Sequence, residues 1–224
     1  MKSNKKTARL SGLLYLLVII FGIYAELYVR AKFIIPDNTA ATVENILTHA
    51  VTFRMGFVSD LLMQVAYFFL AFTLYHLFKN VNKSHALLML LSVVISVAIM
   101  CINMLHQYAA IILLEKENLT TAFDIEQVNE LVLFTLTLQK YGYRIAQIFF
   151  GIWLFPLGYL VYQSGRIPKW IGILLMIGCF SFLLDFFLFF LVKNYSSSLS
   201  SMVTLPTTIA EFSMCLWLLI VGIR

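Results

Sequence analysis

Charged and amide side chains lie inside stretches of this sequence that are otherwise apolar. In FGIYAELYVR, residues 21–30, Glu26 ends a long apolar run and Arg30 follows four residues later. Side chains of this kind can bind an ion, exchange a proton or hydrogen-bond a ligand, and inside a membrane they commonly mark such sites. The candidate ligand-binding residues are Glu26, Asp60, Gln64, Asn103, His106, Arg144, Gln147, Asp185 and Glu211.

Arg144 is the basic residue that we expect to pair with the embedded acids. Its guanidinium fork can hold two carboxylates at once and does not deprotonate. Because the acids outnumber this one deep base, we expect at least one carboxyl group to hold a proton or to meet a ligand cation. Arg30, His49 and Arg54 are predicted at the rim of the same site, with Arg30 in the headgroup region.

A metal site is the alternative use of these residues. His106 with Asp60 and Asp185 would offer nitrogen and oxygen ligands to a zinc ion that keeps an open position. The sequence contains no H-E-x-x-H motif, nucleophile elbow, phosphate loop or dinucleotide fingerprint. It therefore leaves the cofactor unknown, and it does not decide whether the protein is an enzyme.

The composition indicates that membrane-spanning helices position these residues. Of 224 residues, 61% are hydrophobic and 12% are charged, whereas about a quarter of a soluble domain is charged. A helix of about 20 residues crosses a hydrocarbon core of about 30 Å. The apolar runs predict an all-α, polytopic six-helix bundle in a single membrane domain, residues 1–224, with spans 9–30, 56–78, 86–112, 141–163, 169–192 and 206–223.

The connections between the spans carry two further patterns. Residues 38–52 and 121–139 have apolar side chains at helical spacing, which predicts amphipathic helices across the outer mouth of the bundle. SSSLSS, residues 196–201, is predicted as a flexible loop, with Pro206 near the first turn of the sixth span. Tyr195, at a span end, suits the interfacial aromatic belt.

The basic residues predict an orientation. With six spans, segments 1–9, 79–86 and 164–169 share one side with Arg224, and they carry Lys and Arg but no Asp or Glu. This bias places both termini in the cytoplasm. The net charge of +5 is then a sign of topology and of attraction to anionic lipid, rather than of nucleic-acid binding. The lipid bilayer is the predicted partner, and the oligomeric state stays open.

Several pieces of the chain together resemble a known family. They are ARLSGLLYL, AELYVR, NILTHAVTFRMGFVSDLL, IFFGIWLFPLGYLVYQSGRIPKWIG and AEFSMCLWLL, in this order. The chain resembles the bacterial multi-pass membrane domain-of-unknown-function family 4386. The resemblance implies a one-domain protein of the bacterial cytoplasmic membrane and brings no assigned activity. The resemblance implies that members of this family carry polar residues at the positions that match Glu26, Arg30, His49, Arg54, Asp60, Asp185 and Glu211.

The depth of the polar residues leads to a functional hypothesis. Each predicted span delivers a polar group to the outer half of the bundle, which predicts a shared polar cavity there. We expect a small, amphiphilic or lipid-like ligand to be recognised or translocated at this cavity. The alternatives are a metal-dependent intramembrane hydrolase that uses His106, and a structural or signalling subunit whose polar layer only joins helices.

Overall fold

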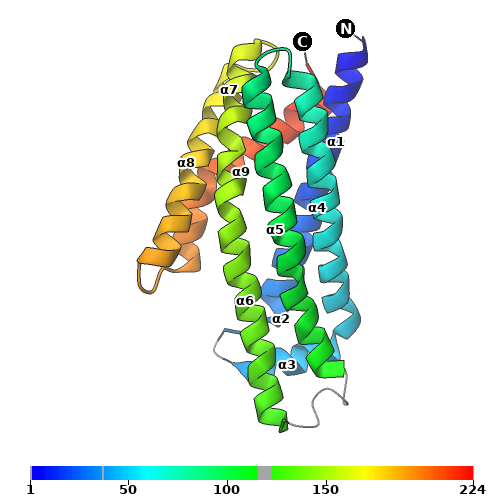
Figure 1. The fold of residues 1–224 in the computed structure, drawn as a ribbon, viewed down its shortest axis with the longest axis vertical. Helices are drawn as coiled ribbons and strands as arrows, with labels where there is room; N and C mark the ends of the chain where they lie inside the picture. Colours follow the sequence, from blue (N-terminus) through cyan, green and yellow to red (C-terminus); the bar gives the residue numbers. More distant parts are fainter. Residues whose placement is uncertain (1, 37, 116–122, 224) are drawn as a thin grey trace. The chain divides into compact units, whose positions relative to one another are not determined.

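The computed structural model describes residues 2–36, 38–115 and 123–223, in which the regular elements are all helices (Figure 1). Seven residues, Tyr24–Arg30, form a π-helix, η1, and the other elements are α-helices. In chain order these are α1 Lys2–Ile23, α2 Ala31–Phe33, α3 Thr39–Thr48, α4 Ala50–Phe78, α5 Lys83–Glu115, α6 Ile125–Ile152, α7 Leu154–Ser164, α8 Lys169–Leu191 and α9 Ser197–Ile220.

Six helical segments within the described residues are long and apolar enough to cross a membrane. They are Asn4–Phe33, Ala50–Phe78, Lys83–Glu115, Ile125–Ser164, Lys169–Leu191 and Ser197–Ile220. Large apolar side chains are exposed along every one of them, among them Leu13, Val58, Leu88, Phe134, Phe180 and Leu205. Such side chains are suited to lipid. The prediction of an all-α protein with six membrane spans is confirmed.

Two of the predicted connections are parts of long helices instead. Residues 123–139 of the second amphipathic segment lead into and form the first half of α6, and residues 121 and 122 lie outside the described residues. The predicted loop at residues 196–201 is the beginning of α9, so that Pro206 lies inside this helix rather than in its first turn. The Ser196 hydroxyl accepts a hydrogen bond from the Leu199 amide at 3.2 Å, which is the usual way in which a serine begins a helix.

The fourth span is interrupted near its middle. α6 ends at Ile152 and α7 begins at Leu154. Pro156 explains the break, because its nitrogen carries no hydrogen to donate to the Ile152 carbonyl four residues earlier.

The described chain packs as two compact units. Unit 1 comprises residues 1–17, 66–98 and 144–224, and unit 2 comprises residues 18–65 and 99–143. α1, α4, α5 and α6 therefore contribute residues to both. The prediction of a single membrane domain stays a prediction.

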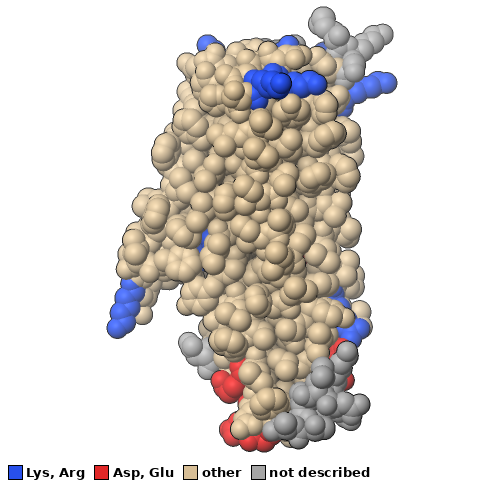
Figure 2. Space-filling model, viewed as in Figure 1, with Lys and Arg blue, Asp and Glu red and all other residues tan. Residues whose placement is uncertain are grey.

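Unit 2 contains the amphipathic helix that the sequence predicts at residues 38–52. Val43 and Ile46 of α3 belong to an apolar cluster with residues of η1, α2, α4, α5 and α6, namely Val29, Phe33, Phe53, Ala110, Ile111, Val132 and Leu136. Asn38 begins this helix by accepting a hydrogen bond from the Ala41 amide at 3.0 Å. Figure 2 shows acidic side chains near the start of α6, where Glu126 and Glu130 belong to this unit.

Unit 1 is held by close helix crossings. Gly158 of α7 and Gly172 of α8 face each other so closely that a Cβ atom at Gly158 would lie 2.5 Å from the Gly172 carbonyl oxygen. Buried aromatic rings pack together in the same unit. The Trp153 ring contacts those of Tyr15 and Tyr67, with centroids 6.0 and 5.2 Å away. Small residues at such crossings let membrane helices approach closely.

Candidate functional site

The π-helix η1 brings Glu26 and Arg30 together in unit 2. A π-helix bonds each amide to the carbonyl five residues earlier, and such turns are frequent at functional sites. Arg30 Nε donates to Glu26 Oε2 at 2.7 Å. The Arg30 side chain is buried, whereas 58% of the Glu26 side chain is exposed.

Arg30 also forms the buried ion pair of unit 2. Its Nη1 donates to Asp60 Oδ2 and its Nη2 lies 3.4 Å from Asp60 Oδ1. The rim position predicted for Arg30 stays a prediction, but the side chain is buried within unit 2, with 8% of the residue exposed. The physical reason is Asp60: a fully buried carboxylate needs a cation or several donors. Arg30, rather than Arg144, supplies that cation.

Polar side chains continue along α4 and α5 from this ion pair. Gln64 follows Asp60 by one turn of α4, and Asn103 and Gln107 are one turn apart on α5. All four side chains are buried. The two helices run antiparallel in unit 2, as two contacts show. The rings of Phe57 and Tyr108 lie 5.3 Å apart between centroids. Arg54 precedes Phe57 on α4, whereas its ion-pair partner Glu115 follows Tyr108 on α5.

Most polar atoms of the carboxamides of Gln64, Asn103 and Gln107 have no hydrogen-bond partner within the described part of the chain. Among the residues that the structure describes, neither the nitrogen nor the oxygen of Gln64 has a hydrogen-bond partner, and the same holds for Gln107. Asn103 Nδ2 donates to the Gln139 carbonyl at 2.8 Å, but its Oδ1 is unpartnered in the same sense. A buried polar group without a partner costs about 1–3 kcal/mol, so such groups are rare and each needs an explanation.

Three more of the predicted residues, His106, His49 and Arg54, lie in unit 2 as well. His106 is half-buried beside Gln107 on α5. His49 is exposed, and its ring stacks on Phe33 at 5.1 Å between centroids. Arg54 pairs with Glu115, and more than half of the Arg54 side chain is exposed. A surface pair of this kind contributes little to stability.

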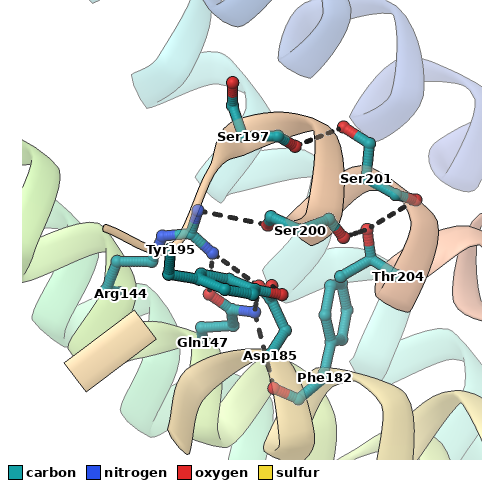
Figure 3. A network of polar contacts seen from close by, with 9 residues as sticks. All are labelled: Arg144, Gln147, Phe182, Asp185, Tyr195, Ser197, Ser200, Ser201 and Thr204. Atoms are coloured by element: carbon teal, nitrogen blue, oxygen red, sulfur yellow. Dashed lines mark hydrogen bonds and ion pairs between the residues drawn. The ribbon is translucent and has the colours of Figure 1, made fainter. Parts of the chain in front are cut away.

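Unit 1 holds a second polar network, around Arg144 of α6 (Figure 3). Arg144 Nη1 donates to Asp185 Oδ2 of α8 at 2.5 Å and to Gln147 Oε1 at 2.9 Å. Its Nη2 donates to Ser200 Oγ of α9 at 3.3 Å, and the guanidinium carbon lies 4.5 Å from the centre of the Phe189 ring. The predicted pairing of Arg144 with an embedded acid is present, and its partner is Asp185.

Asp185 is fully buried and well supplied with donors. Besides Arg144, its Oδ2 accepts from Gln147 Nε2 at 2.6 Å, and its Oδ1 accepts from the Tyr195 hydroxyl at 2.8 Å. Figure 3 shows the Tyr195 ring lying beside Asp185. Desolvation and the hydrogen bond to the Asp185 carboxylate raise the pKa of Tyr195 to about 12. This network joins α6, α8, the α8–α9 turn and α9 with its polar atoms satisfied, as a structural joint does.

Glu211 has a separate neighbour in unit 1. It is half-buried on α9, and its Oε1 accepts from the hydroxyl of the buried Tyr15 at 3.0 Å. The four predicted acids thus have three partners among them: Glu26 and Asp60 share Arg30, Asp185 bonds Arg144, and Glu211 bonds Tyr15. A shared polar cavity stays a prediction.

Among the described residues, neither the pocket described in unit 1 nor a group of metal ligands brings the predicted site residues together. A pocket of about 290 Å³ in unit 1 is lined by Gly165, Arg166, Ile167, Pro168, Lys169 and Trp217, and by none of the predicted ligand-binding residues. Across the described ranges, no group of three or more His, Cys, Asp or Glu side chains could hold a metal ion. His106, Asp60 and Asp185, the alternative metal set, therefore do not form such a group.

Sequence reasoning missed Tyr195 and Ser200 in the Arg144 network. The position of Tyr195 at a span end predicts an interfacial role, and the serine-rich run predicts a loop at Ser200. One signal could have found Ser200: Leu199, Met202, Leu205 and Ile209 recur at helical spacing, and all four are exposed in α9. This lipid-facing stripe begins before Pro206 and predicts the longer helix.

Comparison with known proteins identifies the family. The chain belongs to the family described as "Domain of unknown function (DUF4386)", whose model matches residues 10–222. This confirms the resemblance found in the sequence. A relative from Archaeoglobus fulgidus, described as "Uncharacterized protein", is 34% identical over 152 residues, which are 68% of this chain and 74% of the relative. No solved structure matches the chain.

Proposed function

We propose that this membrane protein recognises or translocates a small or amphiphilic ligand inside unit 2, at Gln64, Asn103 and Gln107, beside the Arg30–Asp60 ion pair. One observation carries the proposal: the buried carboxamides of Gln64 and Gln107 have no hydrogen-bond partner among the described residues. A ligand that bonded them would gain the free energy that the unpaired groups now cost.

Gln147 provides the contrast within the same chain. It is equally buried, yet its Oε1 accepts from Arg144 and its Nε2 donates to Asp185. Where a glutamine only joins helices, its polar atoms are thus used within the protein. This difference supports a ligand role for the unit 2 carboxamides and a structural role for the Arg144 network.

The proposal extends to the place of the protein in the cell. We place it in the cytoplasmic membrane, with the α4–α5 and α7–α8 connections on the cytoplasmic side. The basic residues Lys79, Lys83, Arg166 and Lys169, which lie in or next to these connections, support this orientation.

Thermal unfolding of three glutamine variants tests the site. Gln64→Leu and Gln107→Leu are expected to be as stable as the native protein or more stable, because leucine removes the unsatisfied amide and keeps the volume. Gln147→Leu, the matched control, is expected to lose about 1–3 kcal/mol, because two hydrogen bonds disappear and Asp185 loses a donor.

A panel of small amphiphiles is then screened for ligand-dependent rises in Tm. Stabilisation in the native protein and in Gln147→Leu, but in neither unit 2 variant, is the expected result. If Gln64→Leu and Gln107→Leu were as destabilising as Gln147→Leu, their amides would be structural, and the structural-subunit alternative would be favoured.

A further inference from the structure

The charges of the unit 2 site are already used. Each side-chain nitrogen of Arg30 faces a carboxylate: Nε bonds Glu26, and Nη1 and Nη2 face Asp60. An anionic ligand that took Arg30 would leave Asp60 buried without its cation, which is strongly unfavourable. The ion pair is therefore closed to an anion.

The unbonded atoms are of both hydrogen-bonding kinds. Gln64 and Gln107 each present one oxygen acceptor and one nitrogen donor group, and Asn103 adds an acceptor, Oδ1. A carboxylate would satisfy only the donors, and a cation would satisfy only the acceptors. A hydroxyl or an amide both donates and accepts, so it can satisfy both kinds.

The two helices that carry the polar row, Gln64 of α4 with Asn103 and Gln107 of α5, also carry exposed apolar side chains. Leu62 and Val65 of α4 and Ile102 and Leu105 of α5 are exposed, on other sides of these helices than the buried amides, because residues one or two apart on a helix do not face each other. In the antiparallel register set by Phe57 and Tyr108, residue 64 lies at about the height of residue 101. A polar head among the carboxamides would thus have apolar surface close by for a hydrocarbon tail.

We infer that the ligand is an amphiphile with an uncharged, hydroxyl- or amide-bearing headgroup, which hydrogen-bonds the carboxamides of Gln64 and Gln107. This inference rests on the proposed function and names its ligand class. The Arg30–Asp60 pair holds η1 against α4 and is not the counter-ion of the ligand.

Three amphiphiles with the same chain length and different headgroups test the inference. 1-Monooleoylglycerol is neutral with two hydroxyls, oleate is an anion, and oleylamine is a cation. Each is titrated into the detergent-purified full chain, and the rise in Tm gives the half-saturating concentration. The native protein is compared with Gln64→Leu, with Gln107→Leu should that variant fail to fold, and with Gln163→Leu, which changes an exposed glutamine of α7.

We expect 1-monooleoylglycerol to saturate the native protein and Gln163→Leu at a concentration about tenfold lower than either charged amphiphile, and to lose this advantage in Gln64→Leu. Loss of one or two hydrogen bonds corresponds to about a tenfold change in affinity. If oleate or oleylamine were preferred and the preference vanished in Gln64→Leu, the uncharged headgroup would be overturned while the site survived. If all three acted equally on native and variant protein, or none acted, both the inference and the proposed function would fall.

Discussion

The buried carboxylate of Asp185 makes Arg144→Leu the single substitution with the largest expected effect on stability. It is fully buried, and Arg144 supplies its positive partner at 2.5 Å. Arg144→Leu is expected to lower the free energy of unfolding by about 3–5 kcal/mol, because a buried carboxylate loses its cation. Chemical denaturation of the purified protein measures the change.

The double variant Arg144→Leu, Asp185→Leu provides the control. Removing both charges is expected to restore most of the lost stability, since a buried pair replaced by apolar residues is often neutral. An Arg144→Leu protein as stable as the native one would contradict the pairing.

Tyr195, in the α8–α9 turn, predicts a pH dependence. Its folded pKa of about 12 lies above the unfolded value of about 10, so the folded state keeps the proton to higher pH. The stability from this hydroxyl is therefore present below about pH 10 and is lost as the pH rises through about 12. Unfolding of native protein and Tyr195→Phe, measured across this range, should show a difference that shrinks with rising pH. A difference that stayed constant would mean that Tyr195 does not titrate in this way.

At the scale of elements, the α7–α8 crossing depends on the absence of a side chain at Gly158. A Cβ atom there would meet the Gly172 carbonyl oxygen at 2.5 Å and the Met176 amide nitrogen at 2.9 Å, and backbone atoms cannot move aside alone. Gly158→Ala is expected to cost about 1–3 kcal/mol, the range for overpacking.

Gly22→Ala is the matched control for this crossing. The atom nearest to its new methyl group would be the Met63 sulfur at 2.9 Å, at the far end of a flexible side chain. Its loss of stability should therefore be clearly smaller than that of Gly158→Ala, as measured by thermal unfolding in the same detergent. Equal losses would show that the crossing is not the tight point.

At the scale of the whole molecule, the proposed orientation can be tested with two exposed serines. Ser84, at the start of α5, and Ser198, in the first turn of α9, are each replaced by cysteine in a chain whose three native cysteines are alanine. A membrane-impermeant thiol reagent added outside intact cells should label Ser198→Cys and leave Ser84→Cys unlabelled until the cells are opened. The reverse result would invert the orientation.

The number, type and approximate position of the membrane helices could be predicted from the sequence. A span depends on the summed hydrophobicity of about 20 neighbouring residues. The spans at residues 86–112 and 169–192 can therefore be predicted from their own composition, without knowing which helices pack against them. The ends were harder to predict. Ser197–Ser201 contain four serines but continue a helix, because Ser196 satisfies a free amide and Leu199 extends the lipid-facing stripe.

The sequence by itself thus determined six membrane helices, the family, and the presence of embedded acids, amides and arginines, because these follow from local composition and order. Only the tertiary structure decided which of them meet. Arg30 bonds Asp60 because η1 turns it inward, and Tyr195 and Ser200 reach the Arg144 network because α9 begins early. Gln64 and Gln107 remain unbonded within the described residues although Gln147 is bonded. Partnership depends on helix rotation and neighbours distant in sequence, which no local pattern records.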